Sequence, residues 1–200
     1  MEVNLKTNNM KKGLILVLFA LVSVVSFSQV SWNAKVGMNM SNLSNSEMDM
    51  KIGFQAGVGM EYAFSDMWSI RPSLMFTTKG AKAKEEGVKI TSTPMYLELP
   101  VMAAASFAVT ENQNVVVKAG PYFAYGIGGK NKASYEGESQ KEDFFVDGVK
   151  KFDAGIGVGV AYEINKFFVD LTGEFGLTKL TDGDKAPKNT NFTIGVGYKF

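Results

Sequence analysis

Apolar and polar residues alternate along the last ten residues of the chain. Phe192, Ile194, Val196, Tyr198 and Phe200 share one set of positions, and Thr193, Gly195, Gly197 and Lys199 share the other. Side chains in a β-strand point alternately to opposite faces. The pattern therefore predicts a strand with one apolar face and one small, polar or charged face.

Seven more stretches show the same alternation and predict further strands. With the terminal stretch they cover Trp32–Leu43, Ile52–Phe64, Trp68–Thr78, Ile90–Phe107, Val115–Ile127, Phe152–Ile164, Phe167–Leu177 and Asn191–Phe200. Each is close to the ~9–11 residues that a tilted membrane strand needs, and their number is even. We therefore predict an all-β fold, an eight-stranded antiparallel up-and-down transmembrane β-barrel of the OmpA/OmpX type, over residues 29–200.

The links between these strands alternate in length. Short links are expected at 65–66, 108–114 and 165–166, and longer polar links at 42–51, 79–89, 128–151 and 178–190. Outer-membrane barrels have short periplasmic turns and longer extracellular loops. This asymmetry predicts an integral outer-membrane protein with both termini in the periplasm. Its last strand ends on aromatic residues, and we expect Tyr198 and Phe200 to be the signal for the barrel-assembly machinery.

Aromatic residues gather at the predicted strand ends. One group would lie on the periplasmic side, namely Trp32, Phe64, Trp68, Phe107, Tyr162, Phe167 and Phe200. A second group would lie at the other level, namely Phe54, Phe76, Tyr125, Phe152, Phe175 and Phe192. Two such levels are typical of the aromatic girdles at the interfaces of a membrane with water.

The polar face of each strand must then point into the barrel. Charges of both signs enclosed in a narrow tube have to pair, because an unpaired buried charge is very costly. We predict an interior salt-bridge network centred on Arg71, Lys118 and Glu98, with Asp153, Asp170 and Glu174 as further acceptors and Tyr122 beside them. We interpret this network as structural filling; the alternative is a path for protons or ions.

Residues 1–28 have the features of a secretory signal peptide. The positive segment 10–12 is followed by an apolar run over 13–27 and by small residues at Ser26 and Ser28. We expect cleavage after Ser28, and Met10 is an alternative start. The other interpretation is a transmembrane anchor. A spanning helix requires roughly 20 apolar residues, more than the run over 13–27 provides.

Composition limits the classes of function. Residues 29–200 carry 18 basic and 19 acidic residues, which provides no basic field for nucleic acid. The chain has no Cys and no His, the residues that most often serve as metal ligands and general bases. The acidic group Glu136, Glu138, Glu142 and Asp143 is interleaved with lysines, and we interpret it as a solvated loop. We predict no enzyme activity, no cofactor and no metal.

Four segments resemble the small porin-like outer-membrane barrels of Bacteroidota called PorT-like. They are Val36-Gly37-Met38-Asn39-Met40-Ser41, Tyr96-Leu97-Glu98-Leu99-Pro100-Val101, Ala119-Gly120-Pro121-Tyr122 and Val196-Gly197-Tyr198-Lys199-Phe200. The leader ending Phe27-Ser28-Gln29 is also typical of that phylum. The resemblance implies an outer-membrane barrel, and for larger members a role in type IX secretion.

Three hypotheses of function follow. The first is a non-enzymatic outer-membrane protein, in contact with outer-membrane lipid, that acts as an envelope scaffold or binds an extracellular or envelope protein through its long loops. The second is a narrow porin-like channel or an accessory of protein export. The third is a soluble periplasmic binder of the lipocalin kind, with an apolar cavity. An eight-stranded barrel has an interior that side chains just fill, which favours the first.

Overall fold

The computed structural model describes residues 29–44, 48–85, 88–135, 138–183 and 185–200. Within this chain, residues 31–200 form one compact unit. The predicted signal peptide, residues 1–28, lies outside the described residues. No helix among the described residues is long and apolar enough to cross a membrane.

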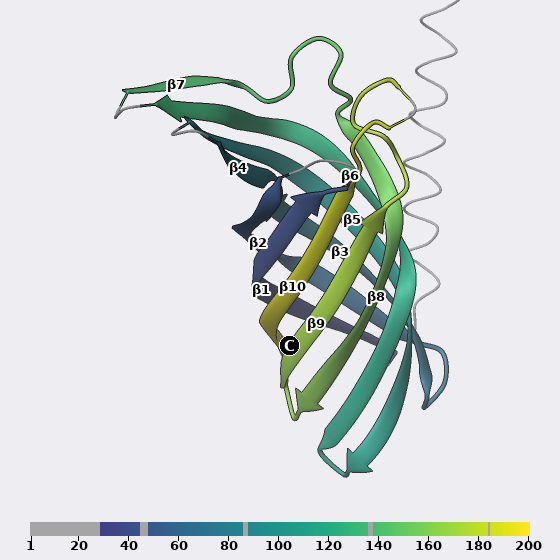
Figure 1. Cartoon of the computed structure of the whole chain (residues 1–200). Helices are drawn as coiled ribbons and strands as arrows, with labels where there is room; N and C mark the ends of the chain where they lie inside the picture. The colour runs from purple at the N-terminus through teal and green to yellow at the C-terminus, as the bar shows by residue number, and fades with distance from the viewer. Residues whose placement is uncertain (1–28, 45–47, 86–87, 136–137, 184) are drawn as a thin grey trace, which may run out of the picture. The chain divides into compact units, whose positions relative to one another are not determined.

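The unit is built from ten strands (Figure 1). They are β1 (Val30–Leu43), β2 (Asp49–Ala63), β3 (Trp68–Thr78), β4 (Ala81–Glu85), β5 (Val88–Thr110), β6 (Gln113–Tyr135), β7 (Glu138–Asp143), β8 (Phe152–Ile164), β9 (Phe167–Gly176) and β10 (Asn189–Lys199). Eight of them, all except β4 and β7, pair in chain order, and β10 pairs back to β1. The predicted eight-stranded antiparallel barrel is therefore confirmed.

Closure of the ring rests on a continuous ladder between β1 and β10. The antiparallel register runs without a shift from Asn33 opposite Lys199 to Leu43 opposite Asn189. On its other edge β10 pairs with β9, where Thr193 lies opposite Thr172. Because both edges of β10 are paired, this strand leaves no open edge in the wall.

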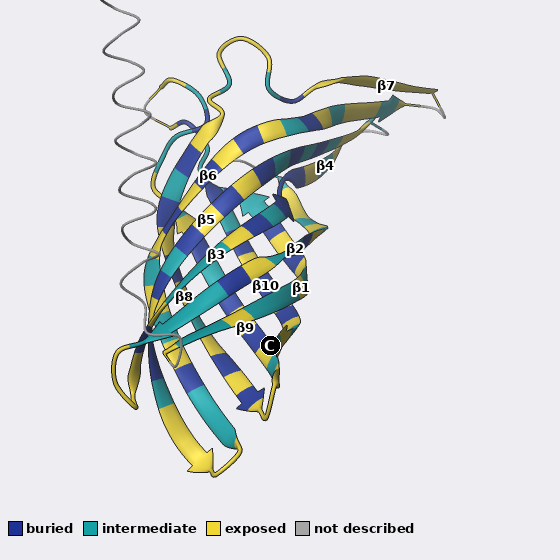
Figure 2. Ribbon diagram, turned by 180° about the vertical axis from the view of Figure 1, so that it is seen from behind, coloured by how far each residue is buried: buried dark blue, intermediate teal, exposed yellow. Residues whose placement is uncertain are grey.

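The two faces of the wall differ as the alternation predicts. On β10, Val196 is 54% exposed whereas Thr193 is 4% exposed. Figure 2 shows the alternation of buried and exposed positions along the strands. Apolar side chains cover the outer face and polar ones fill the interior, which is the arrangement of a membrane barrel and the reverse of a lipocalin.

One end of the barrel carries the short connections at 64–67, 111–112 and 165–166, and we call it the turn end. Asn165 adopts a positive φ of 53°, which suits a two-residue hairpin turn. The seven aromatic side chains predicted for this level are all exposed: Trp32, Phe64, Trp68, Phe107, Tyr162, Phe167 and Phe200. The opposite end, with the longer connections, is the loop end.

At the loop end the prediction needs correction. The predicted links 79–89 and 128–151 contain strands: β4 and β7 lie inside them, and β5 and β6 extend into them to 23 residues each. β7 is polar on both faces, and β4 alternates lysine only with alanine, so the alternation of large apolar residues that marks the strands of the barrel wall is weak or absent here.

These extensions form a four-stranded sheet in the order β4-β5-β6-β7, which we call the projecting sheet. In Figures 1 and 2 its strands leave the loop end and bend away from the barrel axis. The bend coincides with Gly80, just before β4, with Pro94 on β5 and with Gly129 on β6; both glycines have positive φ, and Pro94 lies opposite Gly129. The longer strands of the wall thus continue as a platform beyond the barrel.

Candidate functional site: the barrel interior

Four charged side chains form a closed ring near the turn end. Arg71 lies 2.5 Å from Glu61 and 2.8 Å from Glu163, and Lys199 lies 2.8 Å from each of the same two carboxylates. The four residues come from β3, β2, β8 and β10, so the ring ties together strands on different sides of the wall. Two cations and two carboxylates make this group neutral, which offsets the cost of burying its charges.

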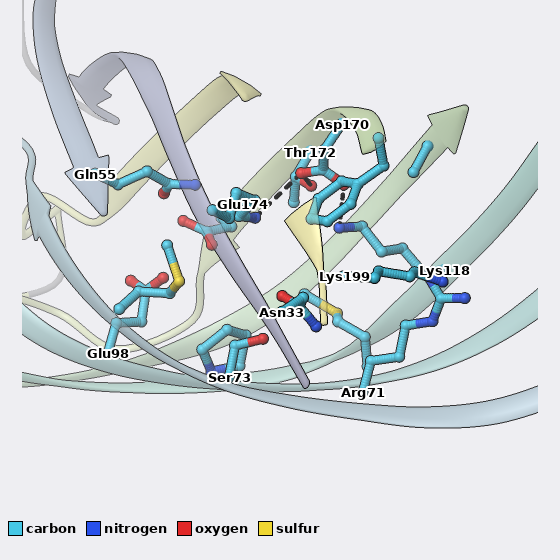
Figure 3. Close-up of a pocket in the computed structure, with 16 residues that line it drawn as sticks. Asn33, Gln55, Arg71, Ser73, Glu98, Lys118, Asp170, Thr172, Glu174 and Lys199 are labelled. Carbon is cyan, nitrogen blue, oxygen red and sulfur yellow. Dashed lines mark hydrogen bonds and ion pairs between the residues drawn. The ribbon is translucent and has the colours of Figure 1, made fainter. Parts of the chain in front are cut away.

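A second group lies farther along the barrel. Lys35 on β1 and Lys118 on β6 both bind the carboxylate of Asp170 on β9, Lys35 at 3.1 Å. The hydroxyl of Thr172 donates to Asp170 at 2.9 Å. Asp170 is 1% exposed and receives three donors, so its charge is well satisfied. Figure 3 shows Lys118, Asp170 and Thr172 of this group. With two lysines and one carboxylate, the group carries a net charge of +1.

The third group is the most deeply buried. The Lys79 ammonium is fully enclosed and lies 2.6 Å from Glu98 and 3.3 Å from Glu174. Asn191 donates to Glu174 at 3.0 Å, and the ammonium also lies 4.4 Å from the centre of the Tyr122 ring, within cation–π range. With two carboxylates and one lysine, this group has a net charge of −1, opposite to the +1 of the second group.

Asp153 forms the last polar group before the loop end. Its carboxylate accepts hydrogen bonds from Tyr122 at 3.2 Å, Thr178 at 2.7 Å and Asn189 at 2.9 Å. The side chain is fully buried, so these three donors replace water as its partners. Asp153 therefore anchors β8 to β6, to β10 and to the segment after β9.

Little space remains between these groups. A cavity of about 60 Å³ lies among the first three groups, and its lining includes Arg71, Lys199, Lys35, Lys118, Asp170, Glu98 and Glu174. Inward glycines make way for the long side chains: a Cβ on Gly155 would lie 2.6 Å from the Tyr122 ring and 2.2 Å from a backbone oxygen.

Apolar residues close the loop end above Asp153. Leu43, Ala81, Phe144 and Leu180 form a buried cluster, and Phe145 packs both against it and against Tyr96. The Phe145 ring lies edge-on to the Phe144 ring, 5.0 Å between centres. We call this cluster the apolar cap; it joins the end of β1 and the start of β4 to side chains from the connections after β7 and β9.

Backbone hydrogen bonds fix the cap in place. The segment after β7 is bonded at both ends to β6, through Phe144 N to Gly129 O and through Gly126 N to Lys151 O. Lys150 N also bonds Leu180 O, and the Lys150 ammonium lies 2.6 Å from Asp182. The hydrogen bond and the charge of Lys150 lower the pKa of the Asp182 carboxyl. The cap thus joins two connections to the wall.

The predicted site residues fall into separate groups rather than one centre. Arg71 lies in the first group, Lys118 and Asp170 in the second, Glu98 and Glu174 in the third, and Asp153 with Tyr122 in the fourth. Each of these side chains points into the barrel. Five ion-pair partners were missing from the predicted network: Lys35, Glu61, Lys79, Glu163 and Lys199. Lys79 follows the inward positions of β3 with the period of two, and this was the signal that could have placed it.

This arrangement provides a packed polar core. Within the described part of the chain, no group of three acidic residues is arranged to hold a metal ion. The carboxylates are instead engaged by lysine, arginine, amide and hydroxyl donors. What the geometry supports is tight binding of the strands to one another and obstruction of the interior.

Comparisons with known proteins agree with this architecture. The sequence model of the outer membrane protein beta-barrel domain matches residues 25–182. No curated protein sequence matches. Among solved structures, a major outer membrane protein of Thermus thermophilus is 12% identical, with a TM-score of 0.50 and coverage of 86% of this chain and 99% of its own.

Two smaller surface proteins are also similar. Ail, the attachment invasion locus protein of Yersinia pestis, is 19% identical, with a TM-score of 0.43 and coverage of 86% and 97%. Neisserial surface protein A is 13% identical, with a TM-score of 0.47 and the same coverage. At these identities, the Thermus match supports the barrel fold alone.

Proposed function

The chain belongs to the outer membrane protein beta-barrel domain family and is therefore an outer-membrane β-barrel, and we propose that it is a non-enzymatic membrane platform rather than a channel. Its turn end and both termini face the periplasm, and its loop end presents the projecting sheet outside the cell. There it acts as an envelope scaffold or binds an extracellular or envelope protein.

The observation that carries this proposal is the filled interior. Four polar groups and the apolar cap follow one another between the turn end and the loop end, and one cavity among the charges measures about 60 Å³. A pore for solutes requires a continuous aqueous path. The ion pairs of Arg71 and Lys79 instead link opposite parts of the wall across that path.

The projecting sheet supports the second half of the proposal. Among the described strands, β7 pairs with β6 alone, so its other edge has free backbone donors and acceptors. Such an edge can accept a strand from another protein. The finer assignment to the PorT-like group of Bacteroidota rests on the segment 96–101 and remains part of the proposal, as does the cleaved signal peptide of residues 1–28.

Single-channel recording in planar bilayers tests the closed interior. We expect refolded protein, verified by heat-modifiable gel migration, to show no stable conductance. Reproducible conductance steps would overturn the platform and favour the channel. The interaction half is tested separately with a photo-crosslinking residue at Gln140 on β7 and a control at Val158 on the lipid-facing wall. Protein adducts specific to Gln140 support it, and equal or absent adducts at both sites contradict it.

A further inference from the structure

Lysines on the projecting sheet all point to one face. In the β-ladders, Lys84 lies opposite Lys89, and Lys82 lies in one row with Thr91, Lys132 and Lys141. The next row on this face joins Thr93 to Lys130 and Asp143. Residues opposite one another in a ladder share a face, as do residues two apart along a strand. The six side chains, Lys82, Lys84, Lys89, Lys130, Lys132 and Lys141, therefore form one surface, the lysine face.

The opposite face has a different character. Its rows contain Ile90 with Ala133 and Gln140, and Ser92 with Asn131 and Glu142. Among the described side chains, the lysine face includes two carboxylates: Asp143, which lies 2.6 Å from Lys130, and Asp49, which is opposite Lys82. Six lysines against two carboxylates leave an excess of four positive charges on one side of a thin sheet.

The lysine face continues the lipid-facing wall of the barrel. On β5 the odd-numbered residues face outward from Leu99 and Leu97, both more than 40% exposed, through Thr93 to Lys89. The same face of β6 carries Tyr125, 56% exposed, before it reaches Lys130. The outer surface therefore changes from apolar, through an aromatic level, to cationic, in the order in which a membrane changes from acyl chains to headgroups.

The bend of the sheet then sets its direction. The strands turn away from the barrel axis (Figure 1), close to Gly80, Pro94 and Gly129. Because the turn is outward, the face that continues the outer wall becomes the side nearer the membrane. All six lysine side chains are exposed, so their ammonium groups are free to reach an anionic surface.

We propose that the lysine face binds the phosphate groups of outer-leaflet lipid and holds the projecting sheet down on the membrane. Each lysine near an anionic lipid surface strengthens binding by about fivefold. The opposite face, with Ile90, Tyr135 and Glu142, is then presented to the outside. This inference does not depend on whether the barrel conducts or which protein the β7 edge binds.

The test uses the absence of cysteine from the chain. A single nitroxide is placed at Ser139→Cys, on the lysine face, or at Gln140→Cys, on the opposite face, in full-length protein in nanodiscs. Broadening of the lipid phosphorus NMR signal measures the distance to headgroups. With phosphatidylglycerol present, we expect the label at position 139 to broaden the signal at least about twice as strongly as the label at position 140, and the difference to shrink in high salt.

Two variants complete the experiment. Replacing Lys82, Lys84, Lys89, Lys132 and Lys141 by Gln should abolish the difference, whereas Glu138→Gln with Glu142→Gln should preserve it. Equal broadening from both labels, or no response to the lysine replacements, would overturn the proposal. The proposal would also be overturned if the protein bound soluble heparin while neither label broadened the lipid phosphorus signal. The lysine face would then bind a soluble polyanion. Heat-modifiable migration shows that each variant is folded.

Discussion

Arg71 is the side chain on which the ring at the turn end depends most. Its guanidinium binds Glu61 and Glu163 at the same time, and the side chain is 14% exposed. We expect Arg71→Ala to lower the free energy of unfolding by about 3–5 kcal/mol, because the buried Glu163 and the largely buried Glu61 would be left with Lys199 alone. Urea unfolding of protein folded in lipid vesicles measures this loss.

An exposed ion pair provides the control for that prediction. Lys130 and Asp143 are 57% and 71% exposed, so Lys130→Ala should change the free energy of unfolding by less than about 1 kcal/mol. If Arg71→Ala were no more costly than Lys130→Ala, the ring would not be a buried, paired group.

Lys79 and Lys35 allow a second comparison at the residue scale. Lys79→Ala leaves Glu98 and Glu174 without their lysine, whereas Lys35→Ala leaves Asp170 bound to Lys118. We expect the first change to cost at least about 2 kcal/mol more than the second. The same urea titration measures both, and adding Glu98→Gln and Glu174→Gln to Lys79→Ala should recover part of the loss. Equal costs would contradict the pairing.

The sequence was sufficient to identify which residues point inward but not which of them meet. Alternation along a strand gives the face of a side chain directly. The partner of Arg71 depends instead on the stagger between strands, since Glu163 is supplied by β8 and Glu61 by β2. Alternation alone does not encode that stagger, which explains why one network was predicted where four groups exist.

At the scale of elements, the bend of the projecting sheet depends on glycine. Gly129 has a φ of 142°, and a Cβ on it would lie 2.5 Å from the backbone oxygen of Thr93. A Cβ on Gly128 would have no atom within 4 Å. Gly129→Ala should therefore lower the free energy of unfolding by about 1–3 kcal/mol, through backbone strain.

Its neighbour is the matched control. We expect Gly128→Ala to change the free energy of unfolding by less than about 0.5 kcal/mol. Urea unfolding and protease digestion of residues 130–143 measure the two variants side by side. A bend that tolerates alanine at position 129 as well as at 128 would show that glycine does not determine it.

The strands of the barrel wall were predictable for a physical reason that does not apply to the projecting sheet. In the wall, one face meets lipid and the other meets a polar interior, so apolar and polar residues must alternate. In the projecting sheet β7 is polar on both faces, and opposite its lysines β4 carries only the small residues Ala81 and Ala83. The pattern that marks a strand disappears there, and β4 and β7 were therefore predicted as loops.

At the scale of the whole molecule, the two tryptophans report its depth in the membrane. Trp32 and Trp68 are 56% and 48% exposed at the turn end. Both should lie in the interfacial region. We expect brominated lipids carrying bromine near the headgroup to quench their fluorescence more than lipids brominated deep in the acyl chain.

Single-tryptophan proteins separate the two signals. Trp32→Phe and Trp68→Phe should each retain the shallow profile, because the girdle places both rings at one level. Deep quenching of either residue would mean that the membrane boundary does not coincide with the turn end.

The ladder between β1 and β10 also governs how the molecule can fold. Asn33 pairs with Lys199, so a pairing that closes the wall joins residues from almost opposite ends of the chain. Contacts this distant along the sequence make folding slow, because loop closure must precede them. Until β10 arrives, β1 and β9 each retain an open edge. Folding intermediates with these open edges are therefore prone to aggregate. Loss of residues 189–200 alone would leave the same two edges unpaired in the barrel and allow other chains to pair with them.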